Sequence, residues 1–435
     1  MGAVTLIAIL CLLLVGMVAI ASRVFGGSWL APIAFFPGIW FVYLSAPLVL
    51  APHFYLSASA ILIITAIIVF WFIGSMLALA MPLLSAPLPR SGGIQVKENV
   101  CCSRALVFCG LVSIVSFVYL TLMPILDLLG PMVPSSALGV LEGVEDLARD
   151  SAFKRYREFS VPGLVQNVMV MLTYTACLAA GSMLACTRPI RISSYLWAVG
   201  VTLPLVALVG HGVVQNTKAT VLYAVVLYLS GYALAEAGSK DVLRRFFRLS
   251  YLVIGIVLVI AAGSLFLWMQ QTRYSENPLT MADAYNLFLV YAVGYLGGFS
   301  YWLDHYYPAS QTTGGSQTFF LVFKILGLRS STTLPVQQPK MLYRDLETNV
   351  NTAFADLMLD FGLLGLLFFL SGCAFLMSIC YRAFVRGSLL PIAILALFYA
   401  SSLWSFTTSI AKYSTIVGAV VIFQILIMRL PSGSR

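Results

Sequence analysis

Residues 55–84 read YLSASAILIITAIIVFWFIGSMLALAMPLL and contain no charged side chain. A helix needs about 20 consecutive apolar residues to cross the hydrocarbon core of a bilayer, so this stretch is long enough to span one. Similar runs recur along the chain. The sequence therefore predicts an all-α integral membrane protein with about eleven transmembrane helices, at residues 4–21, 29–51, 55–84, 105–127, 164–186, 195–210, 219–236, 250–270, 358–381, 389–405 and 410–428.

The overall composition supports this class. Of the 435 residues, 60% are hydrophobic and only 9% are charged. Soluble domains carry about 25% charged residues on average, and a water-soluble protein could not bury so much apolar surface. No G-x-x-x-x-G-K-[ST] phosphate loop occurs, so the chain is not expected to hydrolyse ATP by itself. The net charge of +9 follows mostly from the loop asymmetry described next, so no nucleic-acid partner is expected.

Basic residues are distributed unevenly between alternate loops. The short loops of one set carry only Lys218 and Lys412, whereas the other set is rich in arginine and lysine. Because cytoplasmic loops carry excess Lys and Arg, the asymmetry predicts a bacterial inner-membrane protein with a periplasmic N-terminus and a cytoplasmic C-terminus. The cytoplasmic set consists of Arg23, Arg90, Lys97, Arg104, Arg188, Arg191, Lys240, Arg244, Arg245, Arg248, Arg382, Arg386, Arg429 and Arg435.

This topology divides the chain into regions. Residues 1–270 would form the first eight helices, residues 271–357 a large periplasmic loop, and residues 358–435 the remaining helices. A first periplasmic loop is expected at about 128–163. Within the large loop, residues 284–303 are apolar enough to form a re-entrant or interfacial helix.

The large loop contains an aromatic segment that ends in Asp304 and His305. Seven tyrosines lie between Tyr274 and Tyr307. Two interpretations are open: an interfacial helix whose aromatic side chains sit at headgroup level, or a platform on which sugar rings stack. Asp304 beside His305 is a candidate pair for accepting a hydroxyl proton, since a carboxylate can orient an imidazole. Alternatively, both side chains point into water at a loop corner before Pro308.

Four polar residues near the re-entry into the membrane share one face of a predicted helix. Asn349, Thr352, Asp356 and Asp360 are spaced 3, 4 and 4 residues apart, which places them on one narrow stripe. A lipid-facing carboxylate would be costly there, so the stripe is predicted to face a polar cavity or a neighbouring helix. As an alternative, Asp360 could be paired to a structural lysine or to backbone at Gly362.

Isolated basic residues near the outer face form a second candidate group. Lys218 lies at the mouth of the seventh predicted helix and Arg273 at the outer end of the eighth. Cations at these positions suit a lipid-linked phosphate. Snorkelling to lipid headgroups is the competing interpretation. Lys340 and Arg344, near the end of the large loop, extend the group.

Two short motifs resemble those of one family. Residues 348–354 read TNVNTAF and residues 359–365 read LDFGLLG. They resemble the N-x-x-T stretch and the following D-F-G-x-x-G of oligosaccharide repeat unit polymerases, the Wzy-type O-antigen polymerases. The large external loop and the number of helices also fit this family. Lys218 stands where such proteins often have arginine.

The resemblance implies a membrane-embedded, metal-independent glycosyltransferase of the GT-C type with no cofactor. The donor would be a polymer on undecaprenyl pyrophosphate, and the acceptor one lipid-linked repeat unit at the same face of the membrane. A polysaccharide chain-length regulator is a candidate partner, beside the membrane lipids. Pyrophosphate and glycan would be bound by Lys218, Arg273, Tyr274, Lys340, Arg344, Asn349, Asn351, Thr352 and Asp360, and the hydroxyl proton accepted by Asp304, His305 or Asp356.

Two other functions remain open. An O-antigen ligase would use the same donor with another acceptor, and His305 suits it because ligases usually rely on a histidine in the large loop. A lipid-linked oligosaccharide flippase is the alternative from another class. Transporters tend to show paired interrupted helices, whereas this sequence predicts mostly uninterrupted ones. Its most transporter-like feature is the series Pro32, Pro37 and Pro47.

Overall fold

The computed structural model describes a chain that is helical over most of its described residues. These residues are 3–82, 96, 103–129, 144–148, 163–185, 194–237, 263–269, 280–307, 312–328, 340–343, 346–350 and 352–429. The chain divides into two compact units. The first combines Met1–Ser91, Ala237–Arg244 and Tyr285–Ser414, and the second combines Gly92–Glu236, Arg245–Ala284 and Thr415–Arg435.

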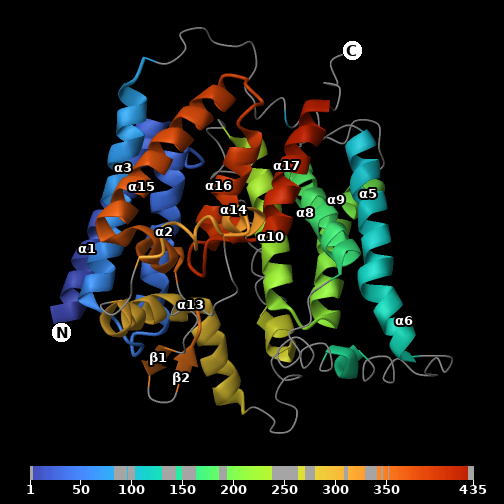
Figure 1. Cartoon of the computed structure of the whole chain (residues 1–435), viewed down its shortest axis with the longest axis horizontal. Helices are drawn as coiled ribbons and strands as arrows, with labels where there is room; N and C mark the ends of the chain where they lie inside the picture. The colour runs from blue at the N-terminus through green and yellow to red at the C-terminus, as the bar shows by residue number, and fades with distance from the viewer. Residues whose placement is uncertain are drawn as a thin grey trace. The chain divides into compact units, whose positions relative to one another are not determined.

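The first unit is a group of long apolar helices with a small hairpin. Helix α15 (Ala353–Val385) packs lengthwise against α3 (Ala58–Ala80), and α1 (Ala3–Gly26) packs against α2 (Pro32–Leu50) (Figure 1). Strands β1 (Lys340–Tyr343) and β2 (Leu346–Thr348) pair antiparallel, with Lys340 opposite Thr348. The helices are α1 (Ala3–Gly26), α2 (Pro32–Leu50), α3 (Ala58–Ala80), α13 (Met281–His305), α14 (Phe320–Ile325), α15 (Ala353–Val385), α16 (Ile392–Trp404) and the 3-10 helix η4 (Ile410–Lys412).

Helix α13 confirms the helix expected at residues 284–303 and extends it at both ends. It lies beside the hairpin, near the end of the α1–α3 group where the N-terminus is marked (Figure 1). Phe54, Leu289, Val293 and Leu342 belong to one buried apolar cluster that joins α13 to β1 and to the segment before α3. Burial of these side chains fixes the hairpin, and with it Lys340, against α13.

The second unit contains α5 (Ser103–Phe117), the π-helical turn η1 (Val118–Leu122), α6 (Met123–Leu129), α8 (Leu164–Leu184), α9 (Ser194–Val214), α10 (Lys218–Glu236) and α17 (Ser414–Arg429). Helices α8 and α10 approach closely because each has a glycine at the contact. A Cβ atom on Gly181 would lie 1.9 Å from the carbonyl oxygen of Tyr228, and one on Gly231 would lie 2.0 Å from that of Leu178. The Ser182 hydroxyl also donates to the Gly231 carbonyl at 2.9 Å. Small residues and such hydrogen bonds are typical of helix contacts in membranes.

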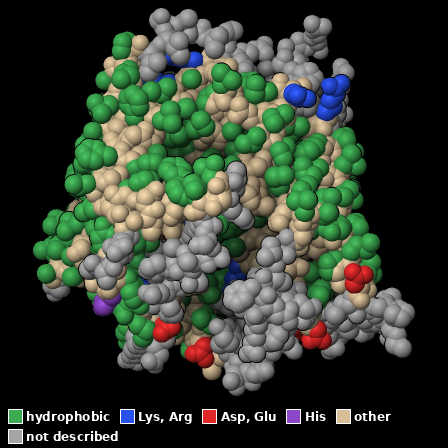
Figure 2. Space-filling view, viewed as in Figure 1, with side chains coloured by type: hydrophobic (Ala, Val, Ile, Leu, Met, Phe, Trp, Pro, Cys, Tyr) green, Lys and Arg blue, Asp and Glu red, His purple; other side chains and the backbone are tan. Residues whose placement is uncertain are grey.

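The integral membrane class is confirmed. Among the described residues, eight helices are long and apolar enough to cross a bilayer, and two shorter apolar helices, α16 and α17, follow. The predicted span 250–270 falls largely outside the described residues. Hydrophobic side chains cover the visible sides of the helices in Figure 2, with few charged ones among them. The spans are Ala3–Gly26, Pro32–Leu50, Ala58–Ala80, Arg104–Asp127, Leu164–Leu184, Tyr195–Val214, Lys218–Glu236 and Ala353–Val385.

In the first unit, the helix break occurs at a glycine of α15 and not at the prolines of α2. Helix α2 starts at Pro32 and continues through Pro37 and Pro47. Helix α15 is the exception to the expected continuity, because Gly362 has a φ of 68° and a ψ of 179° inside it. This backbone conformation is open almost exclusively to glycine. Helix α15 therefore consists of a short first segment, which carries Asp356 and Asp360, and a longer second segment.

Candidate functional site

The head of α15 is anchored to the loop that follows α16. Thr352 has extended backbone angles at the helix N-cap, and the Ala353 amide donates to the Ser405 carbonyl at 2.9 Å. The helix therefore begins only after Thr352. The prediction that four polar residues share one helix face is therefore wrong in part. Asn349 is exposed and precedes the helix by several residues. Only the two carboxylates of the stripe lie within the helix.

Asp356 is held by three donors from the loop after α16. Its Oδ2 atom lies 2.7 Å from the Lys412 ammonium and accepts the Thr408 hydroxyl at 2.9 Å. The Ser409 amide donates to the same oxygen at 3.4 Å. The Asp356 side chain is 3% exposed and that of Lys412 is 19% exposed. A buried ion pair therefore joins α15 to η4.

Lys340 brings a second cation close to the same carboxylate. It is the first residue of β1 and is fully buried. Burial lowers the pKa of Lys340 from 10.5 to about 8, and the nearby negative charge of Asp356 partly opposes this shift. Two lysines thus lie close to one carboxylate at the head of α15. We call Lys340, Asp356 and Lys412 the charged cluster.

Asp360 lies one turn further along α15 and faces a different partner. Its Oδ1 accepts the Thr313 hydroxyl at 2.5 Å and the Gln317 amide at 3.0 Å, and its Oδ2 accepts the Thr318 amide at 2.5 Å. The partner is therefore the Gly/Ser/Thr-rich turn of the large loop. Neither a structural lysine nor backbone at Gly362 supplies these donors, so that alternative interpretation is wrong.

The same turn satisfies the end of the first segment of α15. The Thr313 amide donates to the Leu359 carbonyl at 2.8 Å, next to the break at Gly362. Backbone groups released by a helix break need partners of this kind. Phe361, which lies between Asp360 and Gly362 in the sequence, stacks on Phe369 with ring centres 5.1 Å apart. Each residue of the D-F-G motif thus has a local structural role: Asp360 holds the turn, Phe361 packs, and Gly362 breaks the helix.

Asp304 and His305 do not form the expected orienting pair among the described residues. Asp304 accepts the Tyr55 hydroxyl at 2.8 Å and the Ser57 hydroxyl at 3.1 Å, which ties the end of α13 to the start of α3. His305 instead stacks on Tyr301 with ring centres 4.0 Å apart, and its Nδ1 lies 3.0 Å from the Tyr301 carbonyl. Partial burial and the hydrogen bond to Asp304 raise the pKa of Tyr55.

These contacts create an aromatic patch at the end of α13. Tyr55 lies 5.8 Å from Tyr301 and 6.0 Å from His305, and Tyr306 lies 6.0 Å from Tyr301, measured between ring centres. Tyr55, Asp304 and His305 are exposed, while Tyr301 and Tyr306 are partly buried. We call Tyr55, Tyr301, His305 and Tyr306 the aromatic patch. Exposed rings beside a carboxylate offer both stacking faces and a hydrogen-bond acceptor to a sugar.

The remaining predicted residues separate into two groups. Lys218 belongs to the second unit, where it is the first residue of α10 and its ammonium lies 4.1 Å from the centre of the Phe266 ring. Four others lie outside the described residues: Arg273, Tyr274, Arg344 and Asn351.

Lys412 is the site residue that the sequence argument did not select. The signal was present, since Lys412 and Lys218 are the only basic residues in the short loops of their set. The same reasoning that selected Lys218 applies to Lys412, which the structure places on Asp356.

The described part of the site combines a cluster of two lysines and one carboxylate with an exposed aromatic surface in one unit. Among the described residues, no group of three or more His, Cys, Asp or Glu side chains is arranged to hold a metal ion. The arrangement suits recognition of an anionic group and of a sugar. No protein-family model, curated protein or solved structure matches this chain.

Proposed function

We propose that this membrane protein polymerises undecaprenyl-pyrophosphate-linked oligosaccharide repeat units at the periplasmic face of the bacterial inner membrane. The proposal starts from the likeness of the TNVNTAF and LDFGLLG stretches to Wzy-type polymerases. One structural observation carries it further: Lys412 pairs with Asp356 at the head of α15, and buried Lys340 lies near enough for the same carboxylate to act on it electrostatically. A glycosyl transfer from a lipid pyrophosphate needs cations of this kind to stabilise the leaving group.

In this proposal the lysines of the charged cluster bind the pyrophosphate. Lys412 retains some exposure, so its ammonium can reach an arriving anion. An added negative charge would also favour the protonated form of Lys340. Asp356 positions both lysines. Its Oδ2 already accepts three donors, so accepting a hydroxyl proton there would require breaking one of these contacts.

The aromatic patch would bind the glycan. Tyr55 and Tyr301 present rings for stacking, and Asp304 presents carboxylate oxygens to sugar hydroxyls. Contacts of α13 with Leu342 of β1 link the patch to the strand that begins with Lys340. Pyrophosphate and glycan sites on one rigid group of elements would orient donor and acceptor together.

The test is polymer formation by purified protein from lipid-linked repeat units. Replacing both lysines (Lys340→Gln with Lys412→Gln) should lower the rate by about a hundredfold or more, as for the loss of other charge-stabilising donors. Lys412→Arg should retain much of the rate. Arg429→Gln, at the exposed end of α17, serves as the matched control. A double variant that remains folded and still forms polymer at the normal rate would refute the proposal.

An O-antigen ligase is the second candidate, and His305 favours it because this histidine is exposed at the aromatic patch. Supplying a chemically different acceptor lipid beside the repeat units distinguishes the two. A ligase would transfer glycan to that acceptor and lose this activity in His305→Ala. A polymerase would extend repeat units alone.

The proposed orientation has its own test. Residues 312–317 contact the head of α15, and Ser388 follows its last turn. The second segment of α15 extends for roughly 35 Å, which exceeds a hydrocarbon core of about 30 Å. A reporter inserted at 312–317 is expected in the periplasm and one at Ser388 in the cytoplasm. Finding both reporters on one side would overturn this topology.

A further inference from the structure

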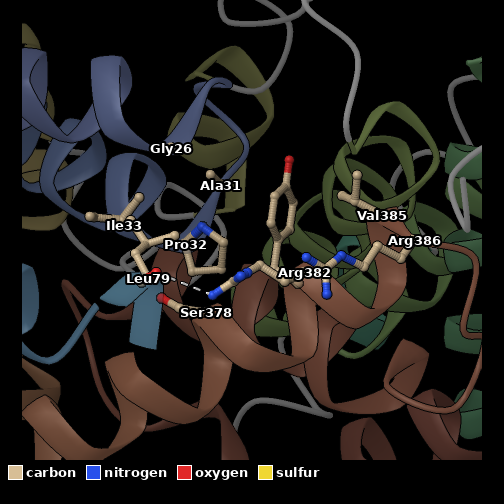
Figure 3. Close-up of a pocket in the computed structure, with 10 residues that line it drawn as sticks. Gly26, Ala31, Pro32, Ile33, Leu79, Ser378, Arg382, Val385 and Arg386 are labelled. Atoms are coloured by element: carbon tan, nitrogen blue, oxygen red, sulfur yellow. Dashed lines mark hydrogen bonds between the residues drawn. The ribbon is translucent and has the colours of Figure 1, made fainter. Parts of the chain in front are cut away.

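A cavity of about 240 Å³ lies at the other end of α15 from the charged cluster. Its wall is formed by the turn between α1 and α2 and by the last turns of α3 and α15 (Figure 3). Neither the proposed polymerase activity nor the ligase alternative involves this cavity. The lining residues are Gly26, Ala31, Pro32, Ile33, Leu79, Ser378, Tyr381, Arg382, Val385 and Arg386.

Two arginines give this cavity its charge. Arg382 and Arg386 are one helical turn apart, and Figure 3 shows both side chains on the same side of α15. None of the described lining residues is acidic. Guanidinium groups donate charge-assisted hydrogen bonds to phosphate oxygens, so a phosphate bound beside both arginines would be stabilised.

The position of Arg382 is fixed by the end of α3. Its Nη1 atom donates to the Ala78 carbonyl at 2.8 Å and to the Met81 carbonyl at 3.2 Å. These are carbonyls of the last turn and C-cap of α3. Because the guanidinium has further N–H groups, one face can be held by the protein while the other donates to a ligand. This anchoring makes the cation part of a preformed site.

The surroundings of the cavity are apolar and outward-facing. Ala31, Pro32 and Ile33 line it with aliphatic carbon. The adjacent ends of α1 and α3 expose large hydrophobic side chains, with Phe25 at 56% and Leu77 at 58% exposure. In a membrane protein such side chains contact acyl chains. A ligand that carries both a phosphate and acyl chains therefore matches the cavity and its surroundings.

We propose that this cavity binds the phosphate headgroup of an anionic phospholipid, with the acyl chains lying along the exposed faces of α1 and α3. Arg386 and the free edge of Arg382 donate to the phosphate oxygens as planar forks. Basic pockets between transmembrane helices commonly recognise anionic lipid headgroups in this way. The proposal is independent of the polymerase function and of the direction in which the chain crosses the membrane.

The test uses purified full-length protein in a neutral detergent. Dioleoyl phosphatidylglycerol, dioleoyl phosphatidylcholine and inorganic phosphate are added separately, and unfolding temperature and retained lipid are measured by thermal scanning and native mass spectrometry. Phosphatidylglycerol should raise the unfolding temperature and remain bound, whereas phosphatidylcholine should do neither at the same concentration. Arg386→Gln should weaken phosphatidylglycerol binding by about tenfold, which corresponds to the loss of one charge-assisted contact.

Control variants distinguish lipid binding at this cavity from non-specific attraction of exposed arginines to lipid headgroups. Arg386→Lys should bind with intermediate affinity, because a point charge replaces the fork. Arg429→Gln removes an exposed arginine at the end of another helix and should bind like the wild type. Equal binding of the two lipids to the wild type, or full phosphatidylglycerol binding by Arg386→Gln, would overturn the proposal. A thermal shift reproduced entirely by inorganic phosphate would overturn its assignment to a lipid. The lipid comparison on the wild type does not depend on whether any variant folds.

Discussion

Asp356 and Asp360 lie one turn apart on the same helix segment and are equally buried, yet their partners differ in kind. Asp356 contacts a flexible ammonium, a hydroxyl and one distant amide. Asp360 contacts two backbone amides and a hydroxyl of one tight turn. Backbone amides of a closed turn cannot exchange their acceptor without unfolding the turn, whereas a lysine side chain can. The comparison therefore assigns Asp360 to architecture and Asp356 to the charged cluster.

The largest effect on the free energy of unfolding is expected from removing the carboxylate of Asp360. Asp360→Ala leaves two amides and one hydroxyl without their acceptor, which should lower the free energy of unfolding by about 3–6 kcal/mol. Asp360→Asn keeps an oxygen for Thr313 and Gln317 but loses the acceptor for Thr318, so about a third to a half of that loss is expected. Thermal or chemical unfolding in detergent measures both. Wild-type stability of Asp360→Ala would contradict the structural role.

Removal of the other carboxylate should affect both stability and activity. Asp356→Asn removes the carboxylate that pairs with Lys412 and acts electrostatically on Lys340. Loss of one partner of a buried pair costs about 3–4 kcal/mol. Adding Lys412→Met removes the lysine that was paired with Asp356, so the double variant should regain part of the lost stability while remaining inactive in polymer formation. A stable but inactive double variant would show that Asp356, unlike Asp360, has a role beyond stability. If activity returned together with stability, Asp356 would be structural like Asp360.

A smaller, pH-dependent effect is expected from Lys340. Its pKa is lowered to about 8 in the folded protein, so between pH 8 and 10.5 the unfolded chain binds more protons than the folded one. Stability should therefore rise with pH across this window, by at most about 3 kcal/mol, and stay flat below it. The difference in unfolding free energy between the wild type and Lys340→Met isolates this effect. A difference that does not change with pH would contradict the burial of an ionisable Lys340.

The smallest effect concerns the helix break that separates the two carboxylates from the rest of α15. Gly362→Ala places a side chain in a conformation reserved for glycine and should cost about 1–3 kcal/mol. Gly372→Ala is the matched control, since Gly372 lies in the same helix and a Cβ atom added there would meet no neighbouring side chain or segment within 4 Å. Alanine there should leave stability unchanged or raise it by up to about 1 kcal/mol. Equal effects of the two substitutions would argue against a required break.

The membrane class and most helix positions could be predicted because hydropathy is a property of contiguous residues. The span around 55–84 is an example, since α3 occupies Ala58–Ala80. Helix α15 starts earlier than the predicted span at 358–381, because polar Asp356 lowers the local hydropathy although the ion pair with Lys412 permits its burial. A local hydropathy average counts Asp356 as a charged residue, because it does not include an ion-pair partner that is distant in the sequence.

The candidate site was predictable only in part. The helical period correctly placed Asp356 and Asp360 on one helix, but it could not identify their partners on separate loops. Lys340 is a second case, because lysine is seldom fully buried and nothing near it in the sequence indicates burial. Its position depends on Leu342, whose contacts with α13 form only in the folded unit.

The hydrogen bond from Thr313 to Asp360 closes a ring of chain that contains α14 and the hairpin. Closing a longer ring adds little entropy cost, about 0.6 kcal/mol for each doubling of its length. Residues inserted between Leu328 and Lys340 should therefore leave the two ends of the ring, and α15 with them, in place. A chain built in this way can change the length and sequence of the connection between these two residues while the hydrogen bonds at Asp360 stay fixed. Length variation in this connection would therefore leave the charged cluster and the helix break at Gly362 in place.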